Sequence, residues 1–586
     1  MNREMTGAEM VVQAFADNGV AHVFGYPGGA VLPIYDALFQ QKDVKHVLVR
    51  HEQGAVHAAE GYARSTGKVG AVVVTSGPGA TNAVTGLADA LMDSIPVVCL
   101  TGQVPTHLIG NDAFQECDTV GITRPCTKHN YLVKNIADLS RILHEAFYVA
   151  ASGRPGPVVV DIPKDIQFAT GTYTSPSNAG HKTYKPRVQG DPDKIKAAVE
   201  LMASAKRPLF YTGGGVINSG PQASRLLREL VRLTKFPITS TLMGLGAYPA
   251  SDPQWLGMLG MHGTYEANWA MHECDVMINV GARFDDRITG RLDAFAPKSK
   301  KIHIDIDPSS INKNVKADIG IIGDCANVLG DMLDAWRASG AKTDAKALAG
   351  WTKQIDGWRA RNCLAYRNSK DVIKPQYAIE RLYALTRDRD VYITTEVGQH
   401  QMWAAQFFKF EEPQRWMTSG GLGTMGYGIP AAVGVQMAHP KSLVIDIAGE
   451  ASVQMTMQEM STAAQYRLPI KIFILNNQYM GMVRQWQELL HGGRYSESYS
   501  EALPDFVKLA EAYHGVGIRC EKPADLDGAI REMIDIDKPV IFDCLVDPAE
   551  NCFPMIPSGK AHNEMLLGDV AGDLEKAIDE KGKVLV

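Results

Sequence analysis

Residues 443–477 read LVIDIAGEASVQMTMQEMSTAAQYRLPIKIFILNN and contain the clearest pattern in the chain. An apolar run leads through a Gly-Glu turn into a helical segment, and a second apolar run ends in two asparagines. Apolar runs that alternate with a helix are typical of neighbouring strands in a parallel sheet. Because the carboxyl ends of such strands share one edge, Glu450 and Asn477 are expected together at a ligand-binding edge.

The same alternation recurs outward from this stretch along most of the chain. Two polar stretches interrupt it, Thr170–Gly190 and Ser339 to about Asp371. The second is expected to be partly helical, and both are interpreted as linkers or domain boundaries. The sequence therefore predicts an α/β protein with domains at 1–170, 190–340 and 372–550 and a C-terminal tail at 551–586. Any kinship between the first and third blocks is expected to be topological. The other runs expected as strands are Val44–Val49, Ala71–Thr75, Pro157–Ile162, Pro208–Thr212, Val276–Val280, Lys301–Asp305 and Val391–Thr395.

Composition and charge exclude several classes of protein. The 586 residues include 59 Lys and Arg against 65 Asp and Glu, a net charge of −6. This balance gives no polycationic surface for nucleic acid, and no apolar run approaches the roughly 18 residues of a membrane helix, so neither partner is expected. Thr6 and Glu9 fit a helix capping box, not a signal sequence. The nine scattered cysteines lack a CxxC pair and favour a reducing, cytoplasmic location.

Several short motifs allow both a structural and a functional interpretation. Gly77–Asn82 follow an apolar run, so this turn either brings backbone N–H groups to a ligand or is a plain tight turn. Glu52 begins a helix, where an acid can simply favour the helix dipole. Glu450 and Asn477 offer oxygen ligands suited to Mg²⁺ and phosphate, or are two turn residues.

Two groups of glycines elsewhere are candidates for nucleotide binding, and the evidence for one is stronger than for the other. Gly421, Gly423 and Gly426 spell GxGxxG, but a convincing preceding strand and a following acidic residue are both missing, which argues against a dinucleotide fingerprint. In the middle block, Gly213–Gly215 and GARFDDR (281–287) each follow an expected strand, and Ile302–Asp307 contains the end of a third. Three such strand ends predict a nucleotide or dinucleotide crevice.

Taken together, the motifs resemble those of the thiamine-diphosphate enzymes. The resemblance rests on RHEQGAVHAAEGYAR (50–64), SGPGATN (76–82) and the paired GEA and NN motifs. More narrowly, the chain resembles the catalytic large subunit of acetohydroxyacid (acetolactate) synthase from about residue 5 to about residue 570. The stretches that carry this are YPGGAVLPIYDAL (26–38), TGQVPTHLIGNDAFQECD (101–118), SGRPGPVVVDIPKD (152–165), GARFDDRITGRL (281–292), SGGLGTMGYGIPAA (419–432), NNQYMGMVRQWQ (476–487) and FPMIPSGKAHNEM (553–565).

The resemblance implies three doubly wound parallel-sheet domains: pyrimidine-binding, central FAD-binding and diphosphate-binding. It implies thiamine diphosphate, Mg²⁺ and a structural FAD as cofactors. The implied reaction decarboxylates pyruvate and condenses the hydroxyethyl group with a second pyruvate or with 2-ketobutyrate, giving 2-acetolactate or 2-aceto-2-hydroxybutyrate for branched-chain amino acid biosynthesis. The implied partners are a second copy of the chain, in a homodimer or dimer of dimers with the active site between two chains, and a small regulatory subunit. The C-terminal tail is expected to lie over the active site.

By the same resemblance, Glu52 protonates and deprotonates the pyrimidine ring, Met425 supports the bent cofactor, and Gln115 and Gly29 face the reacting carbon. Mg²⁺ is assigned to Glu450, Asn477 and the carbonyl of Tyr479. The implied thiamine diphosphate contacts are Glu52, Asn82, Val397, Gly398, Gln399, His400, Gly423, Met425, Ala451, Ser452, Gly481 and Met482.

The second keto acid is assigned to Trp486 and Arg287, with Phe114 and Lys164 as further contacts; an arginine suits a carboxylate. The implied FAD contacts are Arg154, Gly214, Gly215, Thr241, Leu242, Met261, His262, Gly281, Arg283, Asp285, Arg287, Asp305, Ile306 and Asp324.

One residue departs from the family pattern. The diphosphate motif usually carries Asp where this chain has Glu450. The extra methylene moves the carboxylate by about 1.5 Å, whereas Mg²⁺ demands nearly ideal distances. We therefore expect a small backbone shift or a folded rotamer, with metal still bound, though less tightly.

Two other interpretations stay open. The first is another thiamine enzyme, although glyoxylate carboligase lacks the glutamate found here at 52, decarboxylases carry adjacent histidines that this chain lacks, and pyruvate oxidase would not need Trp486 with Arg287. The second is a catalytically inactive paralogue that binds cofactor as a scaffold or regulator, an interpretation favoured only by Glu450.

Overall fold

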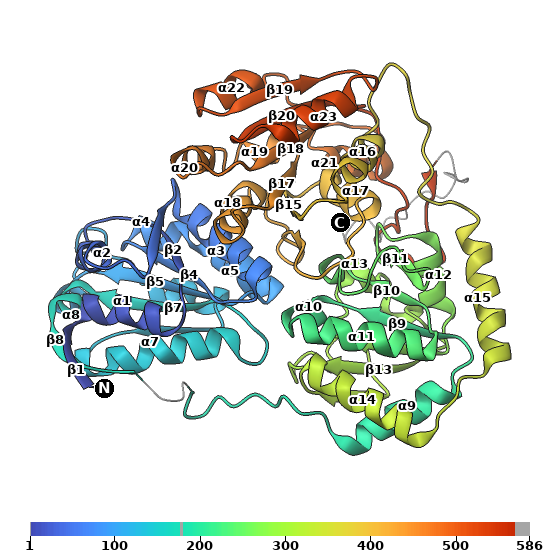
Figure 1. Ribbon diagram of the computed structural model, residues 1–586, viewed down its shortest axis with the longest axis horizontal. Helices are drawn as coiled ribbons and strands as arrows, with labels where there is room; N and C mark the ends of the chain where they lie inside the picture. The colour runs from blue at the N-terminus through green and yellow to red at the C-terminus, as the bar shows by residue number, and fades with distance from the viewer. Residues whose placement is uncertain (1, 176–179, 569–586) are drawn as a thin grey trace.

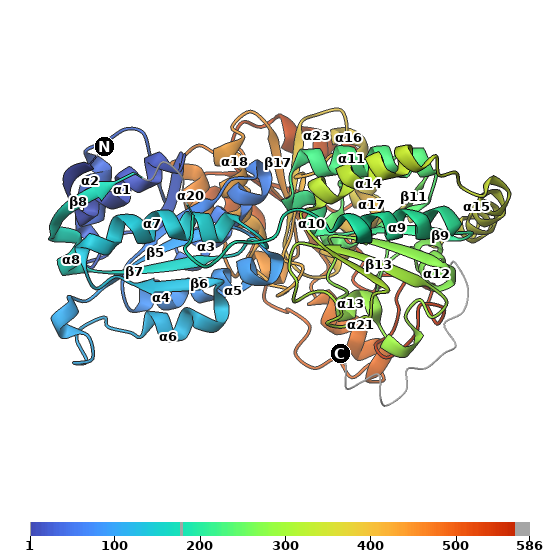
Figure 2. The ribbon, with the colours of Figure 1, turned by 90° about the horizontal axis from the view of Figure 1, so that it is seen from below.

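The structure, a computed structural model, describes residues 2–175 and 180–568 and contains three six-stranded parallel sheets (Figure 1). Helices cover both faces of each sheet, so the fold is α/β and doubly wound, as predicted (Figure 2). Residues 176–179 of the first expected linker and 569–586 of the expected tail lie outside the described residues. Each apolar run expected as a strand is a strand in the structure, with bounds within one residue of those predicted.

The first and third sheets have the same strand order. Numbered within each sheet, the order is second, first, third, fourth, sixth, fifth. The first sheet consists of β2 (His22–Tyr26), β3 (Lys45–Leu48), β4 (Gly70–Val74), β5 (Val97–Gln103), β6 (His129–Leu132) and β7 (Val158–Pro163). The third consists of β15 (Val391–Thr395), β16 (Trp416–Met417), β17 (Leu443–Ala448), β18 (Lys471–Asn476), β19 (Val516–Cys520) and β20 (Val540–Leu545). The kinship of the two blocks is thus topological.

The central sheet has a different order: third, second, first, fourth, fifth, sixth. This is the order of dinucleotide-binding folds, whose ligands bind where the winding reverses between the first and fourth strands. In this sheet those strands are β9 and β12. Its members are β9 (Pro208–Thr212), β10 (Ile238–Ser240), β11 (Trp255–Met258), β12 (Val276–Val280), β13 (Lys300–Asp305) and β14 (Ile319–Ile322).

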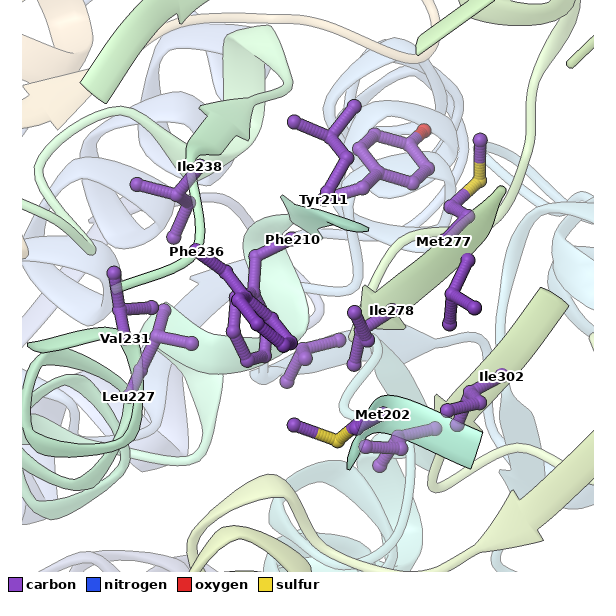
Figure 3. Packing of buried hydrophobic residues seen from close by; sticks show 14 of the residues in the cluster. Met202, Phe210, Tyr211, Leu227, Val231, Phe236, Ile238, Met277, Ile278 and Ile302 are labelled. Atoms are coloured by element: carbon purple, nitrogen blue, oxygen red, sulfur yellow. The ribbon is translucent and has the colours of Figure 1, made fainter. Parts of the chain in front are cut away.

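The core of the central unit shows how these apolar runs hold the layers together. Phe210 on β9 and Phe236 have ring centroids 5.9 Å apart, and Leu227 and Val231 of α11 (Pro221–Thr234) pack in the same cluster (Figure 3). All four side chains are fully buried. Burying one such side chain contributes about 1.5–3 kcal/mol, so the strands are fixed by apolar packing on both faces.

Both expected linkers contain regular structure. The first begins with β8 (Thr170–Thr174), which pairs antiparallel with β1 (Asn2–Thr6), because the Thr- and Tyr-rich segment favours a strand and buries Tyr173. The second contains α15 (Ala345–Arg359), which buries Leu348, Trp351 and Ile355 against the central core. The expected capping box at the N-terminus is confirmed: Thr6 caps α1 (Gly7–Asp17) together with Glu9.

The first and third units pack directly on each other through α3 (Glu52–Thr66) and α18 (Gly428–Ala438). The helices approach so closely that a Cβ atom at Gly434 would lie 1.8 Å from the carbonyl oxygen of Ala58. Glycine at this crossing lets the first unit contact loops of the third unit in the same chain.

Candidate active site

A pocket lies at the carboxyl edge of the third sheet, between the ends of β15 and β17. In this strand order the winding reverses there, which is where open α/β sheets bind ligands. Most residues assigned from the sequence to thiamine diphosphate and to metal line this one pocket. The lining residues are Val397, Gly398, Gln399, His400, Trp403, Met425, Gly449, Glu450, Ala451, Ser452, Leu475, Asn477, Tyr479, Met480, Gly481, Met482 and Val483.

Two helices of ordinary length begin at the pocket. The first residues of α17 (Gln399–Phe407) and of α21 (Gly481–Leu490) line it. The first four backbone N–H groups of a helix have no partner within the helix, and they favour anions together with the helix dipole. The pocket therefore suits a phosphate or diphosphate group, and the fit needs no cationic side chain.

Glu450 provides the pocket with a carboxylate that has an unused oxygen. Its side chain is buried, and Oε1 forms no hydrogen bond in the described structure. Burial raises the pKa of Glu450 to about 8, because the charged form loses its hydration. Asn477 and Tyr479 line the same pocket. A buried carboxylate oxygen that has no partner among the described residues, in a pocket that Asn477 and Tyr479 also line, fits the oxygen ligands that Mg²⁺ takes.

Met425 reaches the pocket on a loop that is anchored from both sides. The buried Glu396 accepts hydrogen bonds from the N–H groups of Gly426 at 2.6 Å and Gly428 at 3.0 Å. Asp93, from the first unit, accepts from the N–H groups of Gly420 at 2.9 Å and Gly421 at 2.7 Å. Neither carboxylate was predicted, because each acts on loop residues that no local spacing connects to it.

The predicted residues of the first unit gather at the carboxyl edge of the first sheet. Glu52 is the first residue of α3, and its Oε2 accepts a hydrogen bond of 2.9 Å from Asn82 Nδ2 at the end of α4 (Pro78–Asn82). A Cβ atom at Gly77 would lie 2.8 Å from the carbonyl oxygen of Gln115. Gln115 itself has a φ of +60°. The SGPGATN turn thus brings Glu52, Asn82 and Gln115 into one neighbourhood.

Gly29 lies in the loop after β2, where a Cβ atom would meet nothing within 4 Å. Lys164 follows β7 as the first residue of α8 (Lys164–Phe168). Both residues are therefore at the same edge as Glu52. Phe114, next to Gln115, is 89% exposed. None of these first-unit residues lines the pocket of the third sheet in a single described chain.

The central sheet presents its predicted residues at the reversal of winding between β9 and β12. Gly214 and Gly215 follow β9, and Gly281 follows β12 with a φ of +67°. A Cβ atom at Gly215 would lie 2.7 Å from the Cα atom of Gly281, so the two turns need glycine to approach each other. Strand order and glycines together fit a dinucleotide such as FAD. A cavity of about 380 Å³ between the first and central units includes Gly214 in its lining.

Apart from Arg154, the other residues assigned to FAD are at or beyond neighbouring strands of the central sheet. Asp324 caps α14 (Cys325–Ser339) and accepts from Ser219 Oγ at 2.8 Å. Arg154 reaches across from the first unit to Asp307 Oδ2 at 3.4 Å. Arg283 Nη1 donates to the carbonyl of Met92 at 2.7 Å. The remaining members at or just beyond these strand ends are Thr241, Leu242, Met261, His262, Asp285, Asp305 and Ile306.

The two residues assigned to the second keto acid are on different units. Arg287 is on α13 (Asp286–Thr289) of the central unit, with a half-exposed side chain. Trp486 is on α21 of the third unit, and its buried Nε1 has no hydrogen-bond partner in the described structure. The described part of the tail lies beside α13: His562 Nε2 is 2.7 Å from the carbonyl oxygen of Ile288.

All nine cysteines are free thiols within the residues that the structure describes. Among residues 2–175 and 180–568, no helix combines the length and the apolar character that crossing a membrane requires.

Comparison with protein families identifies the class that this fold and site define. The chain matches three thiamine pyrophosphate enzyme domains: the N-terminal TPP binding domain over residues 5–122, the central domain over 195–332 and the C-terminal TPP binding domain over 396–544. It therefore belongs to the thiamine pyrophosphate enzymes.

Within that class, the most informative relatives are acetolactate synthases. The large subunit of isozyme 3 from Escherichia coli is 52% identical over 96% of this chain and 98% of its own length. The Haemophilus influenzae large subunit is 50% identical over the same shares, and that of Pyropia yezoensis is 46% identical over 97% of this chain and 96% of its own. The chain is thus a member of the acetolactate synthase large subunit family, as the sequence motifs predicted.

Proposed function

We propose that the chain is the catalytic large subunit of an acetolactate synthase: it decarboxylates pyruvate and joins the two-carbon unit to a second 2-keto acid. The observation that carries the proposal is the pocket at the third sheet, because its lining contains nearly all the residues assigned to diphosphate and metal. The three sheet units correspond in this proposal to the pyrimidine-binding, central and diphosphate-binding domains. Full-length similarity to acetolactate synthases supports it.

The third-unit pocket holds the diphosphate end of the cofactor. When bound, thiamine diphosphate would supply a nucleophilic carbon for reaction with the keto acid. The N–H groups that begin α17 and α21 would bind the diphosphate, and Glu450, Asn477 and the Tyr479 carbonyl would hold Mg²⁺. Met425, which lines the pocket on the loop anchored by Glu396 and Asp93, would support the bound cofactor.

Glu52 holds and moves the proton at the pyrimidine ring nitrogen. Its side chain is buried at the carboxyl edge of the first sheet, which limits the access of water to the carboxyl group. Asn82 Nδ2 donates to Oε2, which orients the group and leaves Oε1 for the ring. A Cβ atom at Gly79 would lie only 3.5 Å from that Oε1, so the turn leaves the free oxygen accessible.

Two chains complete the site. Glu52, Asn82 and Gln115 are outside the pocket of their own chain. Apolar side chains beside that pocket and beside Gln115 are exposed in the single chain: Phe114 at 89%, Met455 at 54% and Leu422 at 44%. A second copy that places its Glu52 edge against this pocket would cover them, which supports at least a homodimer.

The keto acids bind between the two edges. Arg287 would pair with the carboxylate of the second keto acid, and Trp486 would contact its methyl or ethyl group. Phe114, Gln115, Gly29 and Lys164 would come from the other chain. Because one methylene is worth only about 1–3 kcal/mol in such a pocket, the site would accept both pyruvate and 2-ketobutyrate.

FAD binds the central unit in this proposal. Support comes from its strand order and from the glycine pair at β9 and β12. No electron transfer is needed for carboligation, so the flavin has a structural role. The relatives are large subunits, which supports a separate small regulatory subunit. Nine free thiols support a reducing compartment.

The test is an assay of the purified chain with pyruvate, thiamine diphosphate and Mg²⁺, with and without FAD. Acetolactate that requires the cofactors is the expected product. Acetaldehyde or acetate would contradict the proposal and favour a decarboxylase or an oxidase. Failure to form any product even with a regulatory subunit present, while thiamine diphosphate still binds, would favour an inactive paralogue.

A further inference from the structure

Glu459 is a buried carboxylate that the sequence did not place in the site. It is the first residue of α20 (Glu459–Gln465) in the third unit. Its oxygens accept hydrogen bonds from the backbone N–H of Arg50 at 3.0 and 3.2 Å and from that of His51 at 3.1 Å. Arg50 and His51 immediately precede Glu52 in the turn from β3 to α3. A third-unit side chain thus holds the turn that carries Glu52.

We propose that Glu459 is a positioning residue for Glu52, fixing the backbone from which the Glu52 side chain extends. This inference rests on the role proposed above for Glu52. Since Glu52 begins α3, the direction of its Cα–Cβ bond follows from the backbone of residues 50–52. Hydrogen bonds to a carboxylate are about twice as strong as neutral ones. A catalytic group displaced by about 1 Å can lose about 100-fold in rate.

Further contacts show that α20 and Tyr466, the residue after it, support the segment from Leu48 to Glu52 at more than one point. The hydroxyl oxygen of Tyr466 accepts from the N–H of Leu48 at 2.7 Å, and Thr462 Oγ1 donates to Glu459 Oε2 at 2.7 Å. A Cβ atom at Gly54 would lie 2.5 Å from Glu459 Oε1, so the first turn of α3 leaves space for this carboxylate. The contact is therefore built from both units.

Joining the two units does not by itself require this carboxylate. The long packing of α3 along α18 already connects them. Burying a carboxylate costs several kcal/mol unless other groups compensate it. In the described structure Glu459 forms no ion pair, and the partners that compensate it are the N–H groups of Arg50 and His51 and the Thr462 hydroxyl. The main structural consequence of these hydrogen bonds is therefore to fix the turn before Glu52.

If the active site lies between two chains, Glu459 variants should behave in a specific way when they are mixed with other variants. Glu459 is on the same unit as the Glu450 pocket, yet it holds the Glu52 of its own chain, which would serve the partner's pocket. A Glu459 variant should therefore behave as a Glu52 variant. In dimers reassembled from two variant chains, Glu459→Ala mixed with Glu450→Ala should recover one intact site per hybrid. Glu459→Ala mixed with Glu52→Gln should recover none.

The experiment purifies Glu459→Ala, Glu459→Gln and the matched control Glu511→Ala, an exposed carboxylate of the same unit. We expect Glu459→Ala to lower kcat by about 10- to 100-fold, with the KM for pyruvate and the Kd for thiamine diphosphate near those of the parent chain. Glu459→Gln retains one acceptor oxygen and should lose less. Hydrogen exchange should accelerate at the amides of Arg50 and His51. The control should match the parent in every measurement.

Several outcomes would overturn the proposal. Recovery of activity when Glu459→Ala is mixed with Glu52→Gln would place Glu459 with the pocket. Unchanged exchange at Arg50 and His51 would remove the mechanism. If Glu459→Ala does not fold, Glu459→Gln is judged by the same mixing rule and the same amides. Should Glu52→Gln itself remain active, the role proposed for Glu52 fails, and the amide exchange still tests whether Glu459 holds the turn.

Discussion

The first and third sheets share one strand order but present different carboxylates at their carboxyl edges. Glu52, at the first edge, has its Oε2 hydrogen-bonded to Asn82. Glu450, at the third edge, has a buried oxygen that forms no hydrogen bond with any residue the structure describes, and burial raises the pKa of Glu450 to about 8. One topology thus provides two kinds of site: an oriented carboxyl group suited to moving a proton, and an unpaired one suited to a cation.

The largest effect is expected from a substitution that disables only the carboxyl edge of the first sheet. Glu52→Gln keeps the size and the contact with Asn82 but cannot exchange a proton at the ring. We expect kcat to fall by about 10²- to 10⁴-fold, the usual contribution of a general acid or base. The Kd for thiamine diphosphate, measured by tryptophan fluorescence, should change far less, because Trp403 and the diphosphate pocket are on the third unit.

Asp43→Asn, an exposed carboxylate of the same unit, is the matched control and should leave both quantities unchanged. A Glu52→Gln variant with full activity would contradict the assignment of the proton to the first edge.

The second expected effect breaks the third edge. Glu450→Ala removes the carboxylate that would hold Mg²⁺, so half-saturation should need about 100-fold more Mg²⁺, equivalent to about 2.8 kcal/mol at about 1.4 kcal/mol per tenfold. The measurement is a Mg²⁺ titration of thiamine diphosphate binding.

Glu450→Asp restores the residue that the family usually carries. Metal and cofactor dependence equal to that of the parent chain would show that the longer side chain has no special effect. Tighter Mg²⁺ binding would confirm that the extra methylene weakens the site.

The third prediction concerns pH and again separates the edges. A carboxyl group with a pKa of about 8 is mostly protonated at pH 6 and must lose its proton to bind a metal. The apparent affinity for Mg²⁺ should therefore rise with pH, by up to about tenfold per unit, and level off above pH 8. Calorimetry in buffers of different ionisation enthalpy should detect proton release at pH 7. Affinity independent of pH between 6 and 8 would contradict it.

The smallest effect sharpens the first edge. Asn82→Ala removes the amide that orients Glu52 but leaves the carboxyl group. A typical hydrogen bond contributes about 1 kcal/mol, so kcat should fall by about 5- to 10-fold. The effect should disappear in the Glu52→Gln background, and a double-mutant cycle measures this coupling. Additive losses would mean that Asn82 acts elsewhere.

The sequence was sufficient for both edges because both follow buried strands. Glu450 follows β17 by two residues and Asn477 directly follows β18, so strand ends placed both, whereas Glu52, four residues after β3, needed the resemblance as well. Resemblance then supplied their roles. The pocket contains Trp403 and Val483, which are apolar residues on helices with no chemical signal of their own.

The sequence could not show what holds the loops. Asp93 binds the N–H groups of Gly420 and Gly421, more than 300 residues away, and Glu459 binds that of Arg50 at a similar separation. Such contacts depend on how α3 and α18 cross, which no local periodicity records. β8 was also interpreted as linker, because its partner β1 lies at the opposite end of the first unit's sequence.

The most direct test of the account is whether the two edges meet between chains. Glu52→Gln and Glu450→Ala chains, each nearly inactive alone, are mixed, dissociated and allowed to reassemble. With random pairing about half of the dimers are hybrids with one intact site of two, so about a quarter of the parent activity should return. No recovery, with hybrids shown to form, would contradict the account and place both carboxylates in a site within one chain.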